Sequence, residues 1–350
     1  MPDETRSTPA APAAQATAAR RPARARVAAA FAIVYVIWGS TYLAIRYAID
    51  TVPPFLMAAT RFAIAGLMLY LWVRLRGAAR PSRANWLAAL VIGGLLLFGG
   101  NGAVVWSEQH VPSGLVSLLV AIVPLWMVLL DWGIGSGTRP SRAVIAGVAL
   151  GLAGLLLLIG PGALTGTGPI PIAGALVLLL GSLSWATGSI YSRKARLPKE
   201  PLLATAMEML AGSALLFVAS LVTGEWGRVN PGAVSTTSVL AILYLIFFGS
   251  LVAFTAYIWL LRVSTPARVA TYAYVNPVVA VFLGWALAGE PVSARTLIAA
   301  AVIIAAVALI TAGQSGPQAP KPDDAQSRDP APGRRTARRP ARRARAGSSG

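Results

Sequence analysis

Ten separate apolar stretches, each about long enough to cross a lipid bilayer, occupy the chain between Val27 and Thr311. The hydrocarbon core of a bilayer is about 30 Å thick, so a membrane-spanning helix needs roughly 20 apolar residues. Backbone polar groups have no water partner in lipid, and a helix pairs them within itself. We therefore expect an all-α polytopic membrane protein. Its ten transmembrane helices are predicted at 27–49, 54–73, 86–107, 113–134, 142–160, 169–192, 201–223, 238–261, 267–288 and 293–312.

The composition agrees with a membrane protein and excludes several kinds of site. Hydrophobic residues make up 56% of the chain and charged residues only 12%, about half the charged fraction of a soluble domain. There is no cysteine and one histidine, His110, so disulfides, cysteine nucleophiles and Cys or His metal clusters are excluded. We expect no metal, no cofactor and no enzymatic activity.

Lysine and arginine fall almost entirely on one side of the predicted topology. Of these 30 residues, 26 lie in the two tails or in the connections on the same side of the membrane as the tails. An excess of positive charge marks the cytoplasmic side, so we expect both termini in the cytoplasm. The expected location is the inner or plasma membrane. The net charge of +18 then reflects topology and attraction to anionic lipid, and we expect no nucleic-acid partner.

Four segments follow from this organisation. Residues 1–26 and 313–350 are rich in Ala, Pro and Arg, and such compositions cannot bury a core, so we expect two disordered cytoplasmic tails. Binding of a nucleic-acid or regulatory partner is the alternative role for the basic C-terminal tail. Between the tails, we expect one five-helix repeat over 27–160 and a second over 161–312.

The repeat rests on the register of rare residues. Because each repeat holds an odd number of helices, the second must be inverted in the membrane, which is a common transporter architecture. Duplication without transport is the alternative. An offset of 147 pairs Trp38 with Trp185, Arg46 with Arg193 and Pro54 with Pro201, and an offset of 153 pairs Trp106 with Trp259, Pro124 with Pro277 and Trp132 with Trp285.

The chain resembles the EamA-type transporters of the drug/metabolite transporter superfamily across about residues 28–312. This resemblance implies an exporter of amino acids, related metabolites or drugs. One position departs from the family pattern, because Gly137 stands where a glutamate is expected at the end of the fourth helix. The residues that carry the resemblance are Ile37-Trp38-Gly39-Ser40-Thr41-Tyr42, Pro53-Pro54, Arg61-Phe62, Asn276-Pro277 and Gly289-Glu290.

Arg61 and Glu208 are charged residues well inside the second and seventh helices, and the 147 offset makes them equivalent positions. A charge near mid-membrane costs about 2.5–3.5 kcal/mol even on lenient scales, so each should face the bundle or a wet cavity. We interpret Arg61 as an anion contact and Glu208 as an amine contact or the candidate for proton coupling. The alternatives are a buried ion pair between the two, or no contact at all.

Aromatic and amide side chains on other helices complete the predicted substrate pathway, although polar side chains also serve close helix packing. The predicted pathway residues are Trp38, Tyr42, Arg61, Asn101, Trp185, Glu208, Tyr257 and Asn276.

Other polar and proline residues have more local interpretations. Pro124 and Pro277 lie inside helices, where each removes a hydrogen bond, so they are candidate hinges or kinks. We expect Glu290 to begin the tenth helix. Glu108 and His110 lie near the outer edge, where we expect surface roles. We expect interfacial anchoring for most of Trp106, Trp132, Trp226 and Trp285.

The sequence thus predicts a secondary transporter of a small molecule that works by alternating access. It is expected to contact membrane lipids and to act as a monomer or a homodimer. A lipid flippase and a membrane-embedded enzyme acting on lipid-linked substrates are the alternatives.

Overall fold

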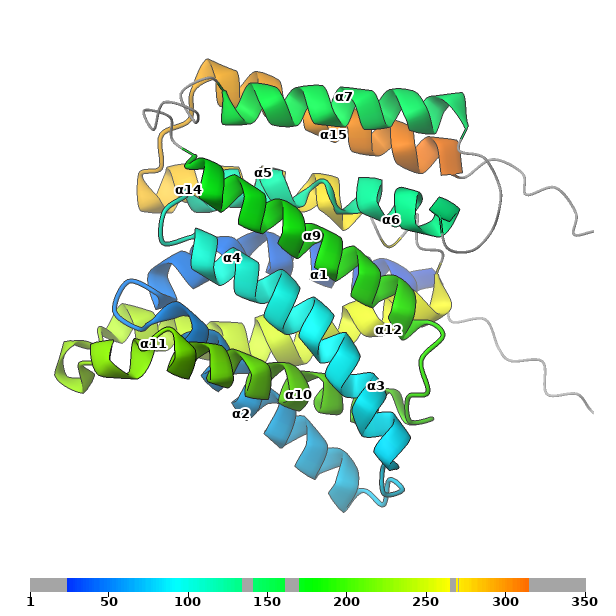
Figure 1. The fold of residues 1–350 in the computed structure, drawn as a ribbon, viewed down its shortest axis with the longest axis vertical. Helices are drawn as coiled ribbons and strands as arrows, with labels where there is room; N and C mark the ends of the chain where they lie inside the picture. The colour runs from blue at the N-terminus through cyan, green and yellow to red at the C-terminus, as the bar shows by residue number, and fades with distance from the viewer. Residues whose placement is uncertain (1–23, 134–140, 161–169, 265–268, 270, 315–350) are drawn as a thin grey trace, which may run out of the picture. The chain divides into compact units, whose positions relative to one another are not determined.

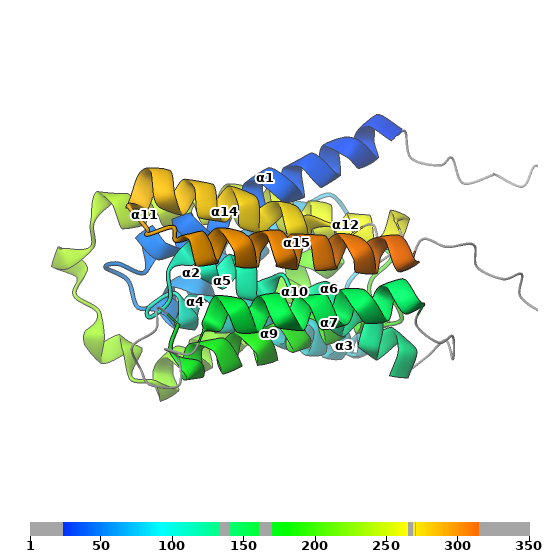
Figure 2. The ribbon, with the colours of Figure 1, turned by 90° about the horizontal axis from the view of Figure 1, so that it is seen from above.

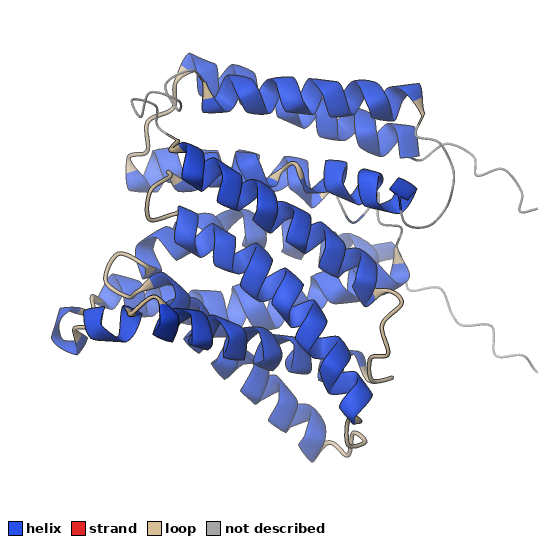
Figure 3. Cartoon of the chain, viewed as in Figure 1, coloured by secondary structure: helices blue, strands red, loops and turns tan. Residues whose placement is uncertain are grey.

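The computed structural model describes residues 24–133, 141–160, 170–264, 269 and 271–314. Figure 3 shows that the regular structure within these ranges is helical throughout. Gly137 and the C-terminal arginine pairs lie outside the described residues. So do the predicted tails, except for residues 24–26, which belong to the first helix, and residues 313–314, which end the last.

The helices confirm the predicted fold of ten spans (Figure 1). Eight are long and apolar enough to cross a membrane, while the apolar parts of the last two, Val275–Ala288 and Ala294–Ile310, are shorter. The first five spans are α1 (Arg24–Ala48), α2 (Pro54–Leu75), α3–η1–α4 (Arg83–Gly93, Gly94–Asn101, Gly102–Ser107), α5–α6 (Ser113–Val120, Val123–Asp131) and α7 (Arg142–Ile159). The second five are α9 (Ile172–Ser192), α10 (Pro201–Val222), α11–η5–α12 (Thr236–Tyr244, Leu245–Phe254, Thr255–Val263), α14 (Tyr272–Ala288) and α15 (Ala294–Gln314). Two short 3-10 turns, η3 (Glu225–Arg228) and η4 (Pro231–Ala233), join α10 to α11.

The most extensive packing joins helices that the repeat makes equivalent. Helix α2 packs along α10, the second span against the seventh, and α7 packs along α15, the fifth against the tenth. Figures 1 and 2 both show α7 and α15 side by side. They also show that α1 begins at the same end of the bundle at which α15 finishes. This pairing is what two inverted five-helix repeats produce around a pseudo-two-fold axis.

Glycine lets α3 and α10 approach closely. A Cβ atom added at Gly212 would lie 2.7 Å from the Cβ of Leu97 and 2.9 Å from the carbonyl oxygen of Gly93. A Cβ atom added at Gly93 would in turn lie 2.7 Å from the backbone nitrogen of Gly212. Small residues at such crossings are typical of membrane helices, because association there depends on close packing.

The two candidate kink prolines differ in their structures. The fourth span breaks at Ala121–Ile122, and Pro124 lies in the first turn of α6, where its missing N–H group costs no hydrogen bond. Pro277 lies inside α14, which continues through it. The equivalent prolines therefore lie in the first turn of one helix and in the interior of another.

The third and eighth spans each contain a π-helical segment, η1 and η5. The 153-residue offset places η1 on the last eight residues of η5, so the two segments are equivalent. π-Helical segments are rare in proteins, and those that occur often lie at functional sites. Nothing in the apolar pattern predicted them.

Two carboxylates of the second repeat bind helix N-termini of the first. Glu290 accepts hydrogen bonds from the backbone N–H groups of Ser113 (2.8 Å) and Gly114 (3.0 Å) at the start of α5. Glu225 accepts from Phe55 (3.2 Å) and Leu56 (2.8 Å) at the start of α2. We call the end of the bundle that carries these four bonds the clamp end. The expectation that Glu290 begins the tenth helix was wrong, since its carboxylate reaches α5.

The glycine crossing generates a test of the packing. Gly212→Ala should destabilise the protein by about 1–3 kcal/mol, because the added methyl group must displace backbone of α3. Gly227→Ala is the matched control, because no heavy atom lies within 4 Å of a Cβ atom added there. Thermal unfolding in one detergent would measure both variants. Equal melting temperatures for the two variants would contradict this account of the crossing.

Candidate functional site

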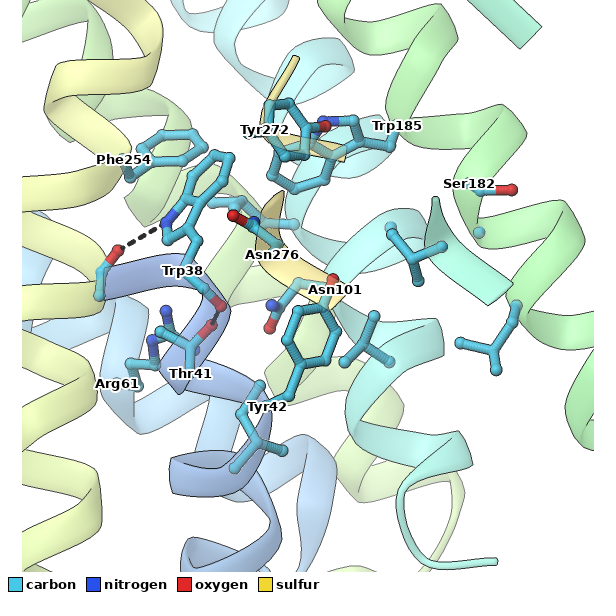
Figure 4. Close-up of a pocket in the computed structure, with 18 of the residues that line it drawn as sticks. Trp38, Thr41, Tyr42, Arg61, Asn101, Ser182, Trp185, Phe254, Tyr272 and Asn276 are labelled. Carbon is cyan, nitrogen blue, oxygen red and sulfur yellow. Dashed lines mark hydrogen bonds between the residues drawn. The ribbon is translucent and has the colours of Figure 1, made fainter. Parts of the chain in front are cut away.

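A cavity of about 70 Å³ lies between the two repeats. Its walls come from α1, α2, η1, α4, α5, α9, η5 and α14 (Figure 4). Both π-helical segments therefore contribute to it, η1 through Asn101 and η5 through Gly249 and Phe254.

Aromatic rings form one wall of this cavity. Trp38 contacts the rings of Trp185, Tyr257 and Tyr272 at centroid separations of 5.5, 4.8 and 5.5 Å. The Trp38 Nε1–H donates to the carbonyl oxygen of Gly249 (3.2 Å). The Tyr257 hydroxyl accepts a hydrogen bond from Trp185 Nε1 (3.2 Å) and shares one with Ser189 Oγ (2.7 Å). These bonds fix the rings, so the wall is a rigid apolar surface.

Arg61 supplies a positive charge to the same cavity. Its side chain is only 3% exposed, and its Nε–H donates to Ser250 Oγ at 2.8 Å. Its Nη1 has no hydrogen-bond partner among the described residues. No carboxylate oxygen within the described ranges lies close enough to Arg61 to form an ion pair. The guanidinium group is therefore a buried cation whose Nη1 can still donate hydrogen bonds. Figure 4 shows Arg61 beside Thr41 and, in that view, below Trp38.

Amide side chains supply the other polar groups of the lining. Asn101 Oδ1 is buried and has no hydrogen-bond partner within the described ranges. The side-chain amide nitrogen of Asn276, assigned from the acceptors around it, donates to the carbonyl oxygens of Tyr35 (3.1 Å) and Tyr272 (3.3 Å). The bond to Tyr35 joins α14 to α1. The cavity thus combines an aromatic wall, one cation and few amides, a composition suited to an amphipathic solute.

The predicted pathway residues divide into three groups. Trp185 and Asn276 line the cavity, as do Trp38, Tyr42, Arg61 and Asn101. Tyr257 lies behind the aromatic wall and contacts its rings. Glu208 does not line the cavity. Thr41, Phe62, Gly249 and Tyr272 line it too, and sequence reasoning did not select them for it.

Glu208 lies on α10, which packs against α2 and α3. Its side chain is fully buried, and neither carboxyl oxygen has a hydrogen-bond partner among the described residues. Arg61 and Glu208 do not form the ion pair that was one alternative. Two equivalent positions of the repeat therefore hold an arginine and a glutamate that do not form an ion pair.

Residues near the predicted outer edge also differ in their surroundings. His110 is exposed, as expected, but Glu108 is only 1% exposed, so the expected surface role for Glu108 was wrong. Glu108 follows the last residue of α4, and the bundle closes over it. Trp132, Trp226 and Trp285 are each about half exposed.

Comparison with known proteins gives the class of this chain. The sequence profile of the EamA-like transporter family matches residues 26–160 and again 172–312. The inner membrane transporter YedA of Escherichia coli (strain K12) is 44% identical over 282 residues, which is 80% of this chain and 89% of YedA. A transporter of Archaeoglobus fulgidus is 28% identical over 81% of this chain and 96% of its own length. A solved crystal structure with 24% identity has the same fold, with a TM-score of 0.60 over 82% of this chain and 98% of the other.

Proposed function

Since the chain belongs to the EamA-like transporter family, we propose that it is a secondary transporter that carries a small carboxylate-bearing solute by alternating access. The single observation that carries the substrate class is Arg61, a buried guanidinium group in the cavity that has no ion-pair partner among the described residues. A buried cation without a counter-ion is costly, and a substrate carboxylate would satisfy it with charge-assisted hydrogen bonds.

The aromatic wall supports an amino acid or a related amphipathic metabolite as the substrate. A carboxylate on Arg61 would leave the rest of the molecule near Trp38, Trp185 and Tyr272, whose faces attract apolar groups and ammonium groups alike. Export, rather than import, is the direction that the family resemblance favours. Drugs of similar shape and polarity fall in the same class.

Alternating access is supported by the inverted repeats and by where the cavity lies. Two inverted bundles have two near-equivalent packings, and a site between them faces each side in turn. The positive charge on the side of the tails favours a cytoplasmic location for both termini, and the clamp end would then face outward. Glu208 is fully buried and has no hydrogen-bond partner in the part of the chain that the structure describes, and it remains the candidate for proton coupling.

Arg61→Met should lower kcat/KM for substrate counterflow in proteoliposomes by roughly 10- to 100-fold, because a hydrogen-bonded charge contributes about 1.5–3 kcal/mol. Labelled amino acids would be screened first to find the substrate. Arg61→Lys keeps the charge without the planar donor geometry, and should lose less. Arg76→Met is the control, because Arg76 is exposed and lies over Trp72. Equal losses in Arg61→Met and Arg76→Met would contradict the proposed substrate contact. Absence of counterflow in the wild type would favour a flippase or an enzyme.

Glu208→Gln should abolish uptake driven by a pH gradient in inverted membrane vesicles, because an amide cannot carry the proton. The measurement is accumulation of labelled substrate with and without an imposed gradient. Glu200→Gln is the matched control, since Glu200 is exposed at the start of the same helix. An unchanged pH dependence in Glu208→Gln would remove Glu208 from the coupling mechanism.

A further inference from the structure

Glu108 is a buried carboxyl group that the proposed substrate site does not use. It lies in the connection between the spans Arg83–Ser107 and Ser113–Leu130, and its backbone N–H donates to the carbonyl oxygen of Val104 at 3.0 Å. The side chain is 1% exposed, and neither carboxyl oxygen has a hydrogen-bond partner among the described residues. An ionised carboxylate in such a place is strongly unfavourable, so this conformation favours the neutral acid.

Its position lies between the cavity and the clamp end. Val104 and Asn101 of the same span line the cavity, and Glu108 is one helical turn beyond Val104. Five residues further along the chain, Ser113 begins α5. The Glu290 carboxylate accepts a hydrogen bond from the backbone N–H of Ser113. Movement of α5 away from α14 would therefore open the bundle beside Glu108.

The charged and titratable groups that face Glu108 come from three elements. They are Glu290 after α14, Arg46 and Tyr42 on α1, and Arg61 on α2. Burial raises the pKa of the Glu108 carboxyl well above its ordinary value, and the Glu290 carboxylate raises it further. Arg46 and Arg61 act in the opposite direction. Arg46 is exposed, so solvent screens its share of the attraction.

We propose that Glu108 is a proton-binding site that holds its proton while the clamp end is closed and releases it to water when that end opens. On opening, the O–H bond of the carboxyl group breaks, and a water molecule takes the proton. Two changes would drive this release: water removes the desolvation cost of the anion, and Glu290 leaves its position beside α5. This role rests on the proposed transport function, in which proton release at Glu108 would accompany opening of the cavity toward one side of the membrane.

The sign of the pH dependence follows from the same argument. Closed and open forms differ in proton affinity, and the closed form binds the proton more tightly. Acidic conditions therefore stabilise the closed clamp end. Raising the pH through the pKa of Glu108 in the closed form should shift the population toward the open form.

The test is infrared difference spectroscopy on the full-length protein in detergent, which needs neither substrate nor transport. At pH 7 the wild type should show the C=O stretch of protonated carboxyl groups. Glu108→Gln should lose the Glu108 component of this band and keep that of the equally buried Glu208, which Glu208→Gln identifies. Asp50→Asn is the control and should keep the band, because Asp50 is exposed. An identical band in the wild type and Glu108→Gln at pH 7 would overturn the proposal.

The link to the clamp has its own measurement. In a pH titration of the band assigned to Glu108, Glu290→Gln should lower the midpoint, because it removes the repulsion and weakens the clamp. Arg46→Met should raise the midpoint, and this exposed position keeps the test usable if Glu290→Gln fails to fold. Midpoints that do not move in the folded variants would show an isolated buried acid and overturn the link. Failure of counterflow would affect only the transport proposal, because these spectra do not depend on it.

Discussion

The fold depends on one constraint, which is that backbone N–H and C=O groups in lipid must find partners within the protein. Helices satisfy all of them except at their ends, where the first N–H groups remain free. At the clamp end, Glu290 and Glu225 bind the free N–H groups of α5 and α2. The same bonds join the two repeats, so the helix ends and the contact between the bundles are stabilised together.

These bonds make the pseudo-symmetric structure unequal at its two ends. The 147 offset pairs Glu225 with Ala78, which packs near Leu203 in the first turn of α10. The 153 offset pairs Glu290 with Gly137, which lies outside the described residues. Neither equivalent position carries a carboxylate. The inverted repeats therefore share a fold without sharing the clamp, and this favours the packing in which the clamp end is closed.

Apolar length and the register of rare residues were enough to predict the ten spans, their inversion and most of the cavity. Arg61 was identifiable because a charged side chain is costly on a lipid-facing surface. Trp38, Tyr42 and Trp185 were identifiable because each lies in a polar or aromatic stripe along one helix face. Other features depend on contacts between distant segments. The partner of Glu290 lies 177 residues away in the sequence, and the burial of Glu108 depends on how several helices close over it.

The π-helical segments were beyond prediction for a different reason. They change the hydrogen-bond pattern without changing the apolar periodicity enough to be seen in one sequence. The sequence also could not decide whether Arg61 contacts Glu208, because equivalent positions in an inverted repeat need not touch. In the proposed function, the separation of these two side chains leaves Arg61 available to bind a substrate carboxylate.

The central claim is that one cavity between the repeats opens to each side of the membrane in turn. The chain has no cysteine, so a single Val120→Cys variant places one thiol on the cavity wall. Its labelling by a membrane-impermeant maleimide would be measured in right-side-out and in inverted vesicles. The account predicts labelling from both sides, with substrate protecting the thiol in each case. Labelling from one side only would contradict it.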